Sequence, residues 1–287
     1  MFPIALRSAE CFFCVMSDTL FFRHYAADPF FNMAFDECLF AHAMRHPGAV
    51  LLRLYTWRPG AITFGFNQRR ETALDFDRLG ETPVIRRITG GRAVYHDVSE
   101  LTYAAAINPH TPERAGLSGS TATIYHLLSK AIMAFLESLG MSSQLVEKSS
   151  PENARPDFFH KAPCFASSAR YEIVTGGRKV VASAQKQIQG VVLQHGSIKI
   201  SGLVGHPALD AAVSDPGPES QPVEKEQFDR TAGQFGRALG DALGVVFEPA
   251  ESLPFNKSEL EERVCEVTKK ALERRIIFKQ TARPNSL

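Results

Sequence analysis

Short apolar runs alternate with amphipathic stretches along most of this chain of 287 residues. The runs are rich in β-branched and aromatic residues, as in Val50–Thr56, which is typical of strands. The stretches repeat an apolar residue every three to four positions, as in Thr121–Leu139, which is typical of helices. A chain with this alternation packs helices against a sheet. The predicted fold class is therefore α/β (α+β), a mixed β-sheet core flanked by helices, with a small helical C-terminal lobe.

Turn residues mark where these elements begin and end. An Arg-Pro-Gly turn at 58–60 and a Gly-Gly turn at 176–177 each separate two strand-like runs, and Gly140 ends a long helix. A Ser258-x-x-Glu261 capping box opens the last helix. The predicted strands span 50–56, 61–66, 84–88, 92–95, 101–107, 171–174, 179–183 and 190–200. The predicted helices span 32–45, 72–79, 121–139, 225–243 and 258–274.

A polar, proline-rich stretch divides the chain. Residues 215–222 (Asp-Pro-Gly-Pro-Glu-Ser-Gln-Pro) form a predicted linker between a core over 19–214 and a helical C-terminal segment over 223–287. Residues 1–18 are predicted to be a poorly ordered extension, because periodic structure begins only near Thr19. A natural start at Met16 is an alternative, which leaves open whether residues 1–15 belong to the protein.

Charge balance and hydropathy argue against two classes of partner. The 32 Lys and Arg residues nearly cancel the 31 Asp and Glu residues, whereas nucleic-acid binding needs a basic footprint. Arg7, Glu10 and Asp18 interrupt the apolar N-terminal stretch, which falls short of the roughly 20 apolar residues of a membrane span. A signal peptide fits poorly as well, since no basic segment precedes an unbroken apolar run. We therefore expect no nucleic-acid partner and no membrane partner.

The five cysteines form no paired framework, which favours a reducing compartment, by default the cytoplasm. Cys11 and Cys14 make a C-x-x-C pair without a second pair at zinc-site spacing, so no metal site is predicted. Cys38 and Cys265 fall in predicted helices and are interpreted as packing residues. Cys164 differs from these four, because it lies among small residues in a loop where a thiol is accessible.

The densest cluster of ligand-binding residue types is Arg86–Asp97 (Arg-Arg-Ile-Thr-Gly-Gly-Arg-Ala-Val-Tyr-His-Asp). Glycines 90 and 91 let the backbone approach a ligand, and Arg86 and Arg87 supply forked donors for phosphate or carboxylate. The alternative interpretation is a structural hairpin flanked by charged residues. The segment lacks the glycine patterns of a P-loop and of a dinucleotide site. Any phosphate-type ligand is therefore bound by a different arrangement of residues.

Three other residues are candidates for catalysis. Lys179 follows Cys164 in a predicted hairpin, and an ammonium close to the thiol would lower the pKa of Cys164 and make it nucleophilic. Spacing alone does not bring the two together, and a buried inert cysteine beside a solvated lysine is the alternative. His195 could be a general base, but a histidine in a strand is more often structural. His96 beside Asp97 is weak evidence for a cysteine–histidine–aspartate triad.

Taken in order, these motifs resemble the lipoate/octanoate transfer family of lipoate-protein ligases, octanoyltransferases and their biotin-ligase relatives. The family implies a mixed sheet flanked by helices, with a bent acyl tunnel. Arg92 and the pair Cys164-Phe165 are similar to the cysteine-dependent octanoyltransferases, because ligases typically read Gly-Gly-Gly in the loop and need no cysteine. One departure is Ser168, which stands where the Cys-Phe-x-x-Pro-Ser pattern of the transferases has proline. The resemblance rests on Asn32–Glu37, Arg53–Trp57, Gly65–Gln68, Arg86–Asp97, Gly177–Ser183 and Leu193–Ile198.

The resemblance implies a double displacement over the core at 19–214. The Cys164 thiolate would attack octanoyl-acyl carrier protein, and a lysine of a lipoyl domain would then attack the enzyme thioester. The implied acceptors are lipoyl domains such as those of glycine cleavage H protein or the 2-oxoacid dehydrogenase E2 subunit. Neither a cofactor nor a metal is implied, because thioester-to-amide transfer is downhill and the donor carries its own phosphopantetheine. The implied catalytic residues are Cys164 and Lys179, and the implied substrate-binding residues are Arg86, Arg87, Gly90, Gly91, Arg92 and His96.

Three alternatives stay open at this point. An ATP-dependent lipoate-protein ligase would use Lys179 on the lipoyl carbonyl and would leave Cys164 incidental. An amidotransferase would move octanoyl between lipoyl domains through the same cysteine. A non-catalytic scaffold would keep only the fold. An ATP requirement identifies the ligase, the donor separates the two transferases, and absence of turnover with any donor supports the scaffold.

Overall fold

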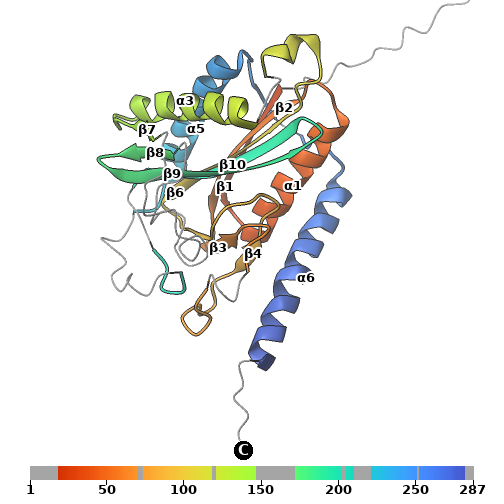
Figure 1. The fold of residues 1–287 in the computed structure, drawn as a ribbon, viewed down its shortest axis with the longest axis vertical. Helices are drawn as coiled ribbons and strands as arrows, with labels where there is room; N and C mark the ends of the chain where they lie inside the picture. Colours follow the sequence, from red (N-terminus) through yellow and green to blue (C-terminus); the bar gives the residue numbers. More distant parts are fainter. Residues whose placement is uncertain are drawn as a thin grey trace, which may run out of the picture.

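The computed structural model describes residues 19–69, 74–117, 121–146, 172–201, 205–209, 221–250 and 252–281. It contains an eight-stranded mixed sheet and a separate three-stranded sheet (Figure 1). The main sheet runs in the order β11 (Glu248–Pro249), β1 (Thr19–Ala27), β2 (Val50–Trp57), β6 (Glu100–Ile107), β10 (Val191–Lys199), β9 (Arg178–Ile188), β8 (Glu172–Thr175) and β7 (Gln144–Val146). The small sheet runs in the order β4 (Val84–Arg86), β3 (Ala61–Phe64) and β5 (Val94–His96).

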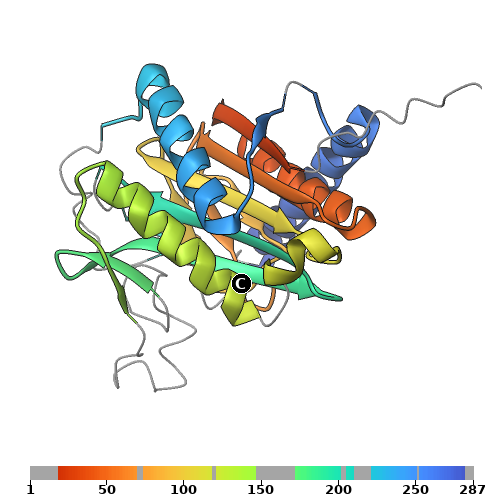
Figure 2. The ribbon, with the colours of Figure 1, turned by 90° about the horizontal axis from the view of Figure 1, so that it is seen from above.

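Helices cover both faces of the main sheet. The helices are α1 (Pro29–Arg45), α3 (Thr121–Ser138), α5 (Lys225–Leu243) and α6 (Lys257–Thr281), with a 3₁₀ helix at Pro112–Leu117. Helices α3 and α5 pack side by side on one face, whereas α1 and α6 pack together on the other (Figures 1 and 2). The predicted fold class is confirmed. The two C-terminal helices do not form a lobe of their own, because each buries its apolar side on a different face of the sheet.

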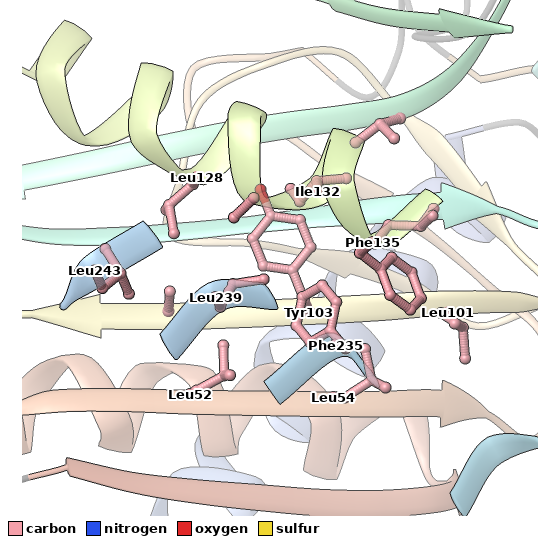
Figure 3. Close-up of a cluster of buried hydrophobic side chains, with 14 of the residues drawn as sticks. Leu52, Leu54, Leu101, Tyr103, Leu128, Ile132, Phe135, Phe235, Leu239 and Leu243 are labelled. Carbon is pink, nitrogen blue, oxygen red and sulfur yellow. The ribbon is translucent and has the colours of Figure 1, made fainter. Parts of the chain in front are cut away.

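The face under α3 and α5 carries the larger apolar core. Because side chains alternate across a strand, one set of residues from β2 and β6 points at these helices. Phe135 of α3 meets Phe235 of α5 edge to face, with ring centroids 5.1 Å apart. Figure 3 shows this cluster, which includes Leu52, Leu54, Leu101, Tyr103, Leu128, Ile132, Phe135, Phe235, Leu239 and Leu243.

The face under α1 is more polar. Asp28 caps α1 by accepting the N–H groups of Phe30 and Phe31 at 2.9 and 3.1 Å, and Pro29 occupies the first turn. Apolar side chains of α1 pack against β2, yet Asn32 and Asp36 are also buried there. The small sheet lies on this side of the molecule (Figure 1). Buried polar groups need hydrogen-bonding partners. Those of Asp36 lie in the candidate functional site.

Most predicted elements are confirmed within a few residues, and two local predictions are wrong. Residues 74–79 form turns rather than a helix, because Asp75 donates its N–H to Ala208 O at 2.7 Å and accepts that of Asp77. The other positions of that predicted helix, 72 and 73, lie outside the described residues. Asn256 rather than Ser258 caps the last helix, since Asn256 Oδ1 accepts the Ser258 N–H at 3.1 Å. No helix in the described ranges is both long and apolar enough to span a membrane.

Candidate functional site

A narrow cavity opens between the main sheet, the small sheet and α1. Its wall is mostly apolar, with Met33 from α1, Trp57 from β2 and Val94 from β5. Two imidazoles, His96 and His195, also line it. A cavity with an apolar wall and a few fixed polar groups is typical of a small-molecule site.

The Gly90-Gly91 loop lines one side of this cavity. Arg87 Nη2 donates to the carbonyl oxygens of Gly90 and Arg92 at 2.9 and 2.7 Å. Because the peptide is planar and trans, the N–H of Gly91 points away from the guanidinium that holds the Gly90 carbonyl. Among the described residues, neither Gly90 nor Gly91 donates its N–H to a backbone carbonyl. Gly91 also lines the cavity, and the predicted binding of a ligand oxygen by these amides stays a prediction.

Two glycines are required for this loop to reach its place. A Cβ at Gly65 would lie 2.0 Å from Gly91 O, so no side chain fits there. Gly91 has a φ of +91°, and a Cβ on it would lie 2.9 Å from Arg87 Nη2. The backbones of Gly65 and Gly91 are therefore in direct contact.

Arg86 braces the neighbouring loop at Gly65–Gln68, which contacts the Gly90-Gly91 loop. Its Nη1 donates to the carbonyls of Gly65 and Gln68 at 3.1 and 3.0 Å and also to that of Phe66. Its guanidinium carbon lies 4.2 Å from the centroid of the Phe64 ring. Arg87 is buried, and Arg86 and Arg92 are partly buried. The described contacts of Arg86 shape the loop at 65–68 and those of Arg87 shape the Gly90-Gly91 loop. Their predicted contact with a carrier protein or phosphate stays a prediction.

His96 links the small sheet to the main sheet. Its Nδ1 lies 2.6 Å from Glu100 Oε1, and its Nε2 lies 2.7 Å from Thr63 Oγ1. Arg87 Nη1 donates to the same Thr63 oxygen at 3.0 Å, so the Thr63 proton is available for His96 Nε2. Burial lowers the pKa of His96, although Glu100 opposes this shift. The ring of Trp57 stacks on the neutral imidazole at 4.2 Å. Asp97 is not the partner of His96, so the triad considered from sequence is not formed.

Behind His96 lies a buried ion cluster of Glu100, Lys199 and Asp97. Lys199 Nζ bonds Glu100 and lies 2.9 Å from Asp97 Oδ2. Burial opposes ionisation of Glu100, but the charge of Lys199 and the hydrogen bonds from His96 and Lys199 outweigh it and lower the pKa of Glu100 to about 2. The same carboxylates raise the pKa of Lys199 against the effect of burial. Glu100 and Lys199 are therefore ionised at neutral pH.

Ionisation of Glu100 in this cluster makes the free energy of unfolding depend on pH. The pKa of Glu100 is about 2 in the folded chain against 4.5 as the reference value, so its contribution is present above about pH 4.5. That contribution is lost as the pH falls toward 2, and it amounts to roughly 3 kcal/mol of unfolding free energy. Urea unfolding between pH 6 and pH 3 should show a shallower decline for Glu100→Gln than for the wild type. Glu137→Gln, an exposed change on α3, should decline like the wild type. Equal declines for both variants would contradict the assignment.

A second buried cluster lies between α1 and the main sheet. Asp36 Oδ1 accepts from Arg53 Nη1 at 2.9 Å, and Asp36 Oδ2 accepts from the Tyr55 hydroxyl at 2.8 Å. His195 Nδ1 lies 3.1 Å from Asp36 Oδ2, and His195 Nε2 lies 2.5 Å from Thr89 Oγ1. Sequence reasoning missed Asp36 and Arg53 as site residues. The signal was a carboxylate inside an apolar helix and an arginine inside an apolar strand.

Lys179 is buried and pairs with Glu172. The two residues lie on the adjacent strands β9 and β8, and Lys179 Nζ donates to Glu172 Oε1. Both side chains are less than one-tenth exposed. Glu172 was also missed as a site residue, although it lies in the predicted strand at 171–174 that leads to the Gly-Gly turn at 176–177. Cys164 lies outside the described residues, so its predicted proximity to Lys179 stays a prediction.

Comparison with known families covers the part of the chain that contains this site. The lipoyl protein ligase A/B catalytic domain matches residues 28–224, which include the Gly-Gly loop, both histidines and Lys179. The chain belongs to this family. The recognition made from sequence motifs is thereby confirmed.

Relatives within the family are named octanoyltransferases. The chain is 32% identical to octanoyltransferase LipM of Kyrpidia tusciae over 248 residues, 86% of this chain and 84% of that one. It is 34% identical to octanoyltransferase LipM of Symbiobacterium thermophilum, over 81% of this chain and 86% of that one.

Solved structures share the family fold. A lipoate-protein ligase A bound with ATP has a TM-score of 0.60 at 18% identity, over 86% of this chain and 94% of that one. A bi-partite lipoate protein ligase from Thermoplasma acidophilum has a TM-score of 0.58 at 16% identity, over 88% and 93%. These two similarities establish the fold alone.

Proposed function

We propose that this chain is an octanoyltransferase of lipoate biosynthesis that works through a thioester on Cys164. The similarity to octanoyltransferases over more than four-fifths of their length carries the proposal. The apolar cavity beside the Gly90-Gly91 loop supports it, because an octanoyl chain needs an apolar wall and its carbonyl needs a donor.

The reaction has two steps that balance without an added energy source. The Cys164 thiolate attacks the thioester of octanoyl-acyl carrier protein, and the phosphopantetheine thiol leaves. The amine of a lipoyl-domain lysine then attacks the enzyme thioester, which gives an amide and returns the Cys164 thiol. Lys179 would stabilise the thiolate, and the Gly91 N–H would donate to the carbonyl oxygen as it gains negative charge.

The donor, acceptor and setting follow from this chemistry. The proposed donor is acyl carrier protein, with the partly exposed Arg86 and Arg92 steering its acidic surface or its phosphopantetheine phosphate, whereas the buried Arg87 shapes the loop. The proposed acceptors are lipoyl domains such as those of glycine cleavage H protein or the 2-oxoacid dehydrogenase E2 subunit. No cofactor or metal enters the proposed steps. Free thiols such as Cys38 fit a cytoplasmic enzyme.

Intact-protein mass spectrometry tests this proposal. The full chain is mixed with octanoyl-acyl carrier protein without ATP, and a hydroxylamine-labile octanoyl adduct is expected. Adding an apo lipoyl domain should discharge the adduct and give an octanoylated, hydroxylamine-stable acceptor. Transfer that requires ATP and free octanoate would identify a ligase instead. An adduct formed only from an octanoylated lipoyl domain would identify an amidotransferase.

A further inference from the structure

His195 connects a buried carboxylate to the start of the Gly90-Gly91 loop. Its Nδ1 lies 3.1 Å from Asp36 Oδ2, and its Nε2 lies 2.5 Å from Thr89 Oγ1. Asp36 comes from α1, His195 from β10 and Thr89 from the loop itself. All three residues are buried, and the His195 ring also lines the cavity. A carboxylate, an imidazole and a hydroxyl are thus connected in series next to the proposed acyl site.

The partners of Asp36 fix the direction of its hydrogen bond with His195. Arg53 donates to Asp36 Oδ1, and the Tyr55 hydroxyl donates to Asp36 Oδ2. Burial raises the pKa of Tyr55 well above its usual value, so this hydroxyl keeps its proton. A carboxylate paired with a guanidinium only accepts, so His195 Nδ1 carries a proton and donates it to Asp36. In the neutral imidazole Nε2 is then an acceptor, and the Thr89 hydroxyl donates to it.

This last bond ties the loop to the main sheet. The other contacts of the loop lead toward the small sheet: Phe66 donates its N–H to Thr89 O at 2.8 Å, and Arg87 holds both Gly90 O and Thr63. The cavity lies between the two sheets, so its width beside Gly91 depends on a bond that spans them. Among the loop's described hydrogen bonds, the Thr89–His195 bond is the one that reaches β10.

We propose that His195, oriented by Asp36, is a positioning residue that fixes Thr89 and so aims the Gly91 N–H at the carbonyl of the acyl group. This inference rests on the proposed octanoyl transfer. An imidazole suits the task, because it can donate at one edge and accept at the other while remaining neutral. Packing alone would not need such a cluster, since apolar residues of similar volume commonly stabilise a core equally well.

Thr89 offers the cleanest test, since its hydroxyl can be removed without changing its branched shape. Thr89→Val should lower kcat for octanoyl transfer by about 10- to 100-fold, because a donor displaced by about 1 Å loses that much rate. The KM for octanoyl-acyl carrier protein should stay within about 2-fold, because Thr89 is buried and is not one of the arginines that steer the carrier. Thr89→Ser keeps the hydroxyl and should restore kcat to within about 3-fold of the wild type.

Thr231→Val is a matched control on α5. It removes another buried threonine hydroxyl, which donates to Gln227 O at 2.6 Å on the opposite face of the sheet. Its kcat should stay at the wild-type value. A Thr89→Val kcat equal to that of Thr231→Val overturns the positioning role and leaves the proposed function intact. A wild-type chain that transfers no octanoyl group overturns the proposed function and the positioning role with it.

Imidazole ¹⁵N NMR of the wild type tests the hydrogen bonds of His195 directly. This measurement does not require that a variant folds. The expected signature for His195 is a protonated Nδ1 and an unprotonated Nε2 that accepts a hydrogen bond. In Thr89→Val the Nε2 resonance should shift toward that of a free acceptor, while Nδ1 stays protonated. A wild-type His195 that carries its proton on Nε2 overturns the proposal, because Thr89 would then not donate to it.

Discussion

Cys164→Ser is expected to abolish both the octanoyl adduct and the transfer to a lipoyl domain. A serine hydroxyl is not ionised at neutral pH and has no general base assigned to it, so it cannot replace a thiolate. The measurement is intact mass after incubation with octanoyl-acyl carrier protein, followed by addition of an apo lipoyl domain. We expect no adduct above background and a loss of transfer larger than about 1,000-fold.

Cys265→Ser is the matched control for this prediction. Cys265 is an exposed free thiol on α6, and a non-specific acylation would occur there. This variant should form the adduct and transfer octanoyl like the wild type. An adduct that disappears in Cys265→Ser but persists in Cys164→Ser would refute the assignment of the nucleophile.

The elements of this fold could be predicted where local signals were strong. The helix at 225–243 agrees exactly with α5, because a continuous apolar stripe and Gly244 at its end leave little freedom. Strand β1 was missed because its partial burial blurs the apolar alternation. β7 and β11 were missed as well; they have three and two residues, and so short a strand carries little periodic signal. The predicted helix over this segment, 74–79, is wrong for another reason: the Asp75 N–H makes a tertiary hydrogen bond to Ala208 O in place of a local helix bond.

The candidate site could be predicted only in part. The Gly90-Gly91 loop and Lys179 are visible in sequence, since glycine pairs and hairpin turns act over a few residues. Asp36 and Arg53 are not, because each looks misplaced until the other is found 2.9 Å away in a different element. The role of Arg87 also needed coordinates. The sequence predicts a ligand-binding arginine there. In the structure its Nη atoms donate to oxygens of Thr63, Gly90 and Arg92.

The role of His195 also depends on contacts that the sequence does not show. Along β10, residues 193, 195, 197 and 199 share one face, so a histidine there looks like one polar residue on a strand. Pairing with β6 and β9 places Ala104 and Ala184 beside it. These small neighbours leave room for the ring to reach Asp36 and Thr89. Only the register of three strands and the packing of α1 supply that information.

Lys179 and Glu172 should change the reactivity of Cys164 in opposite directions. The ammonium favours a thiolate near it, and the buried carboxylate on the same ammonium opposes that thiolate. Lys179→Met should therefore move the pH dependence of Cys164 alkylation up by about one unit or more, and slow acylation at pH 7 by about 10- to 100-fold. Glu172→Gln keeps the ammonium and removes the competing charge, so it should move the same profile down.

Iodoacetamide labelling of the Cys164 peptide from pH 5 to pH 10 measures both shifts on the full chain. Lys130→Met, an exposed change on α3, is the control and should leave the profile in place. Lys179→Met also leaves Glu172 buried without its cation, so its folding is checked by thermal melting before the profile is interpreted. Glu172→Gln provides the independent arm, because a neutral amide costs less there than an unpaired carboxylate. Shifts in the same direction, or none in either variant, would mean that Lys179 does not act on the Cys164 thiol.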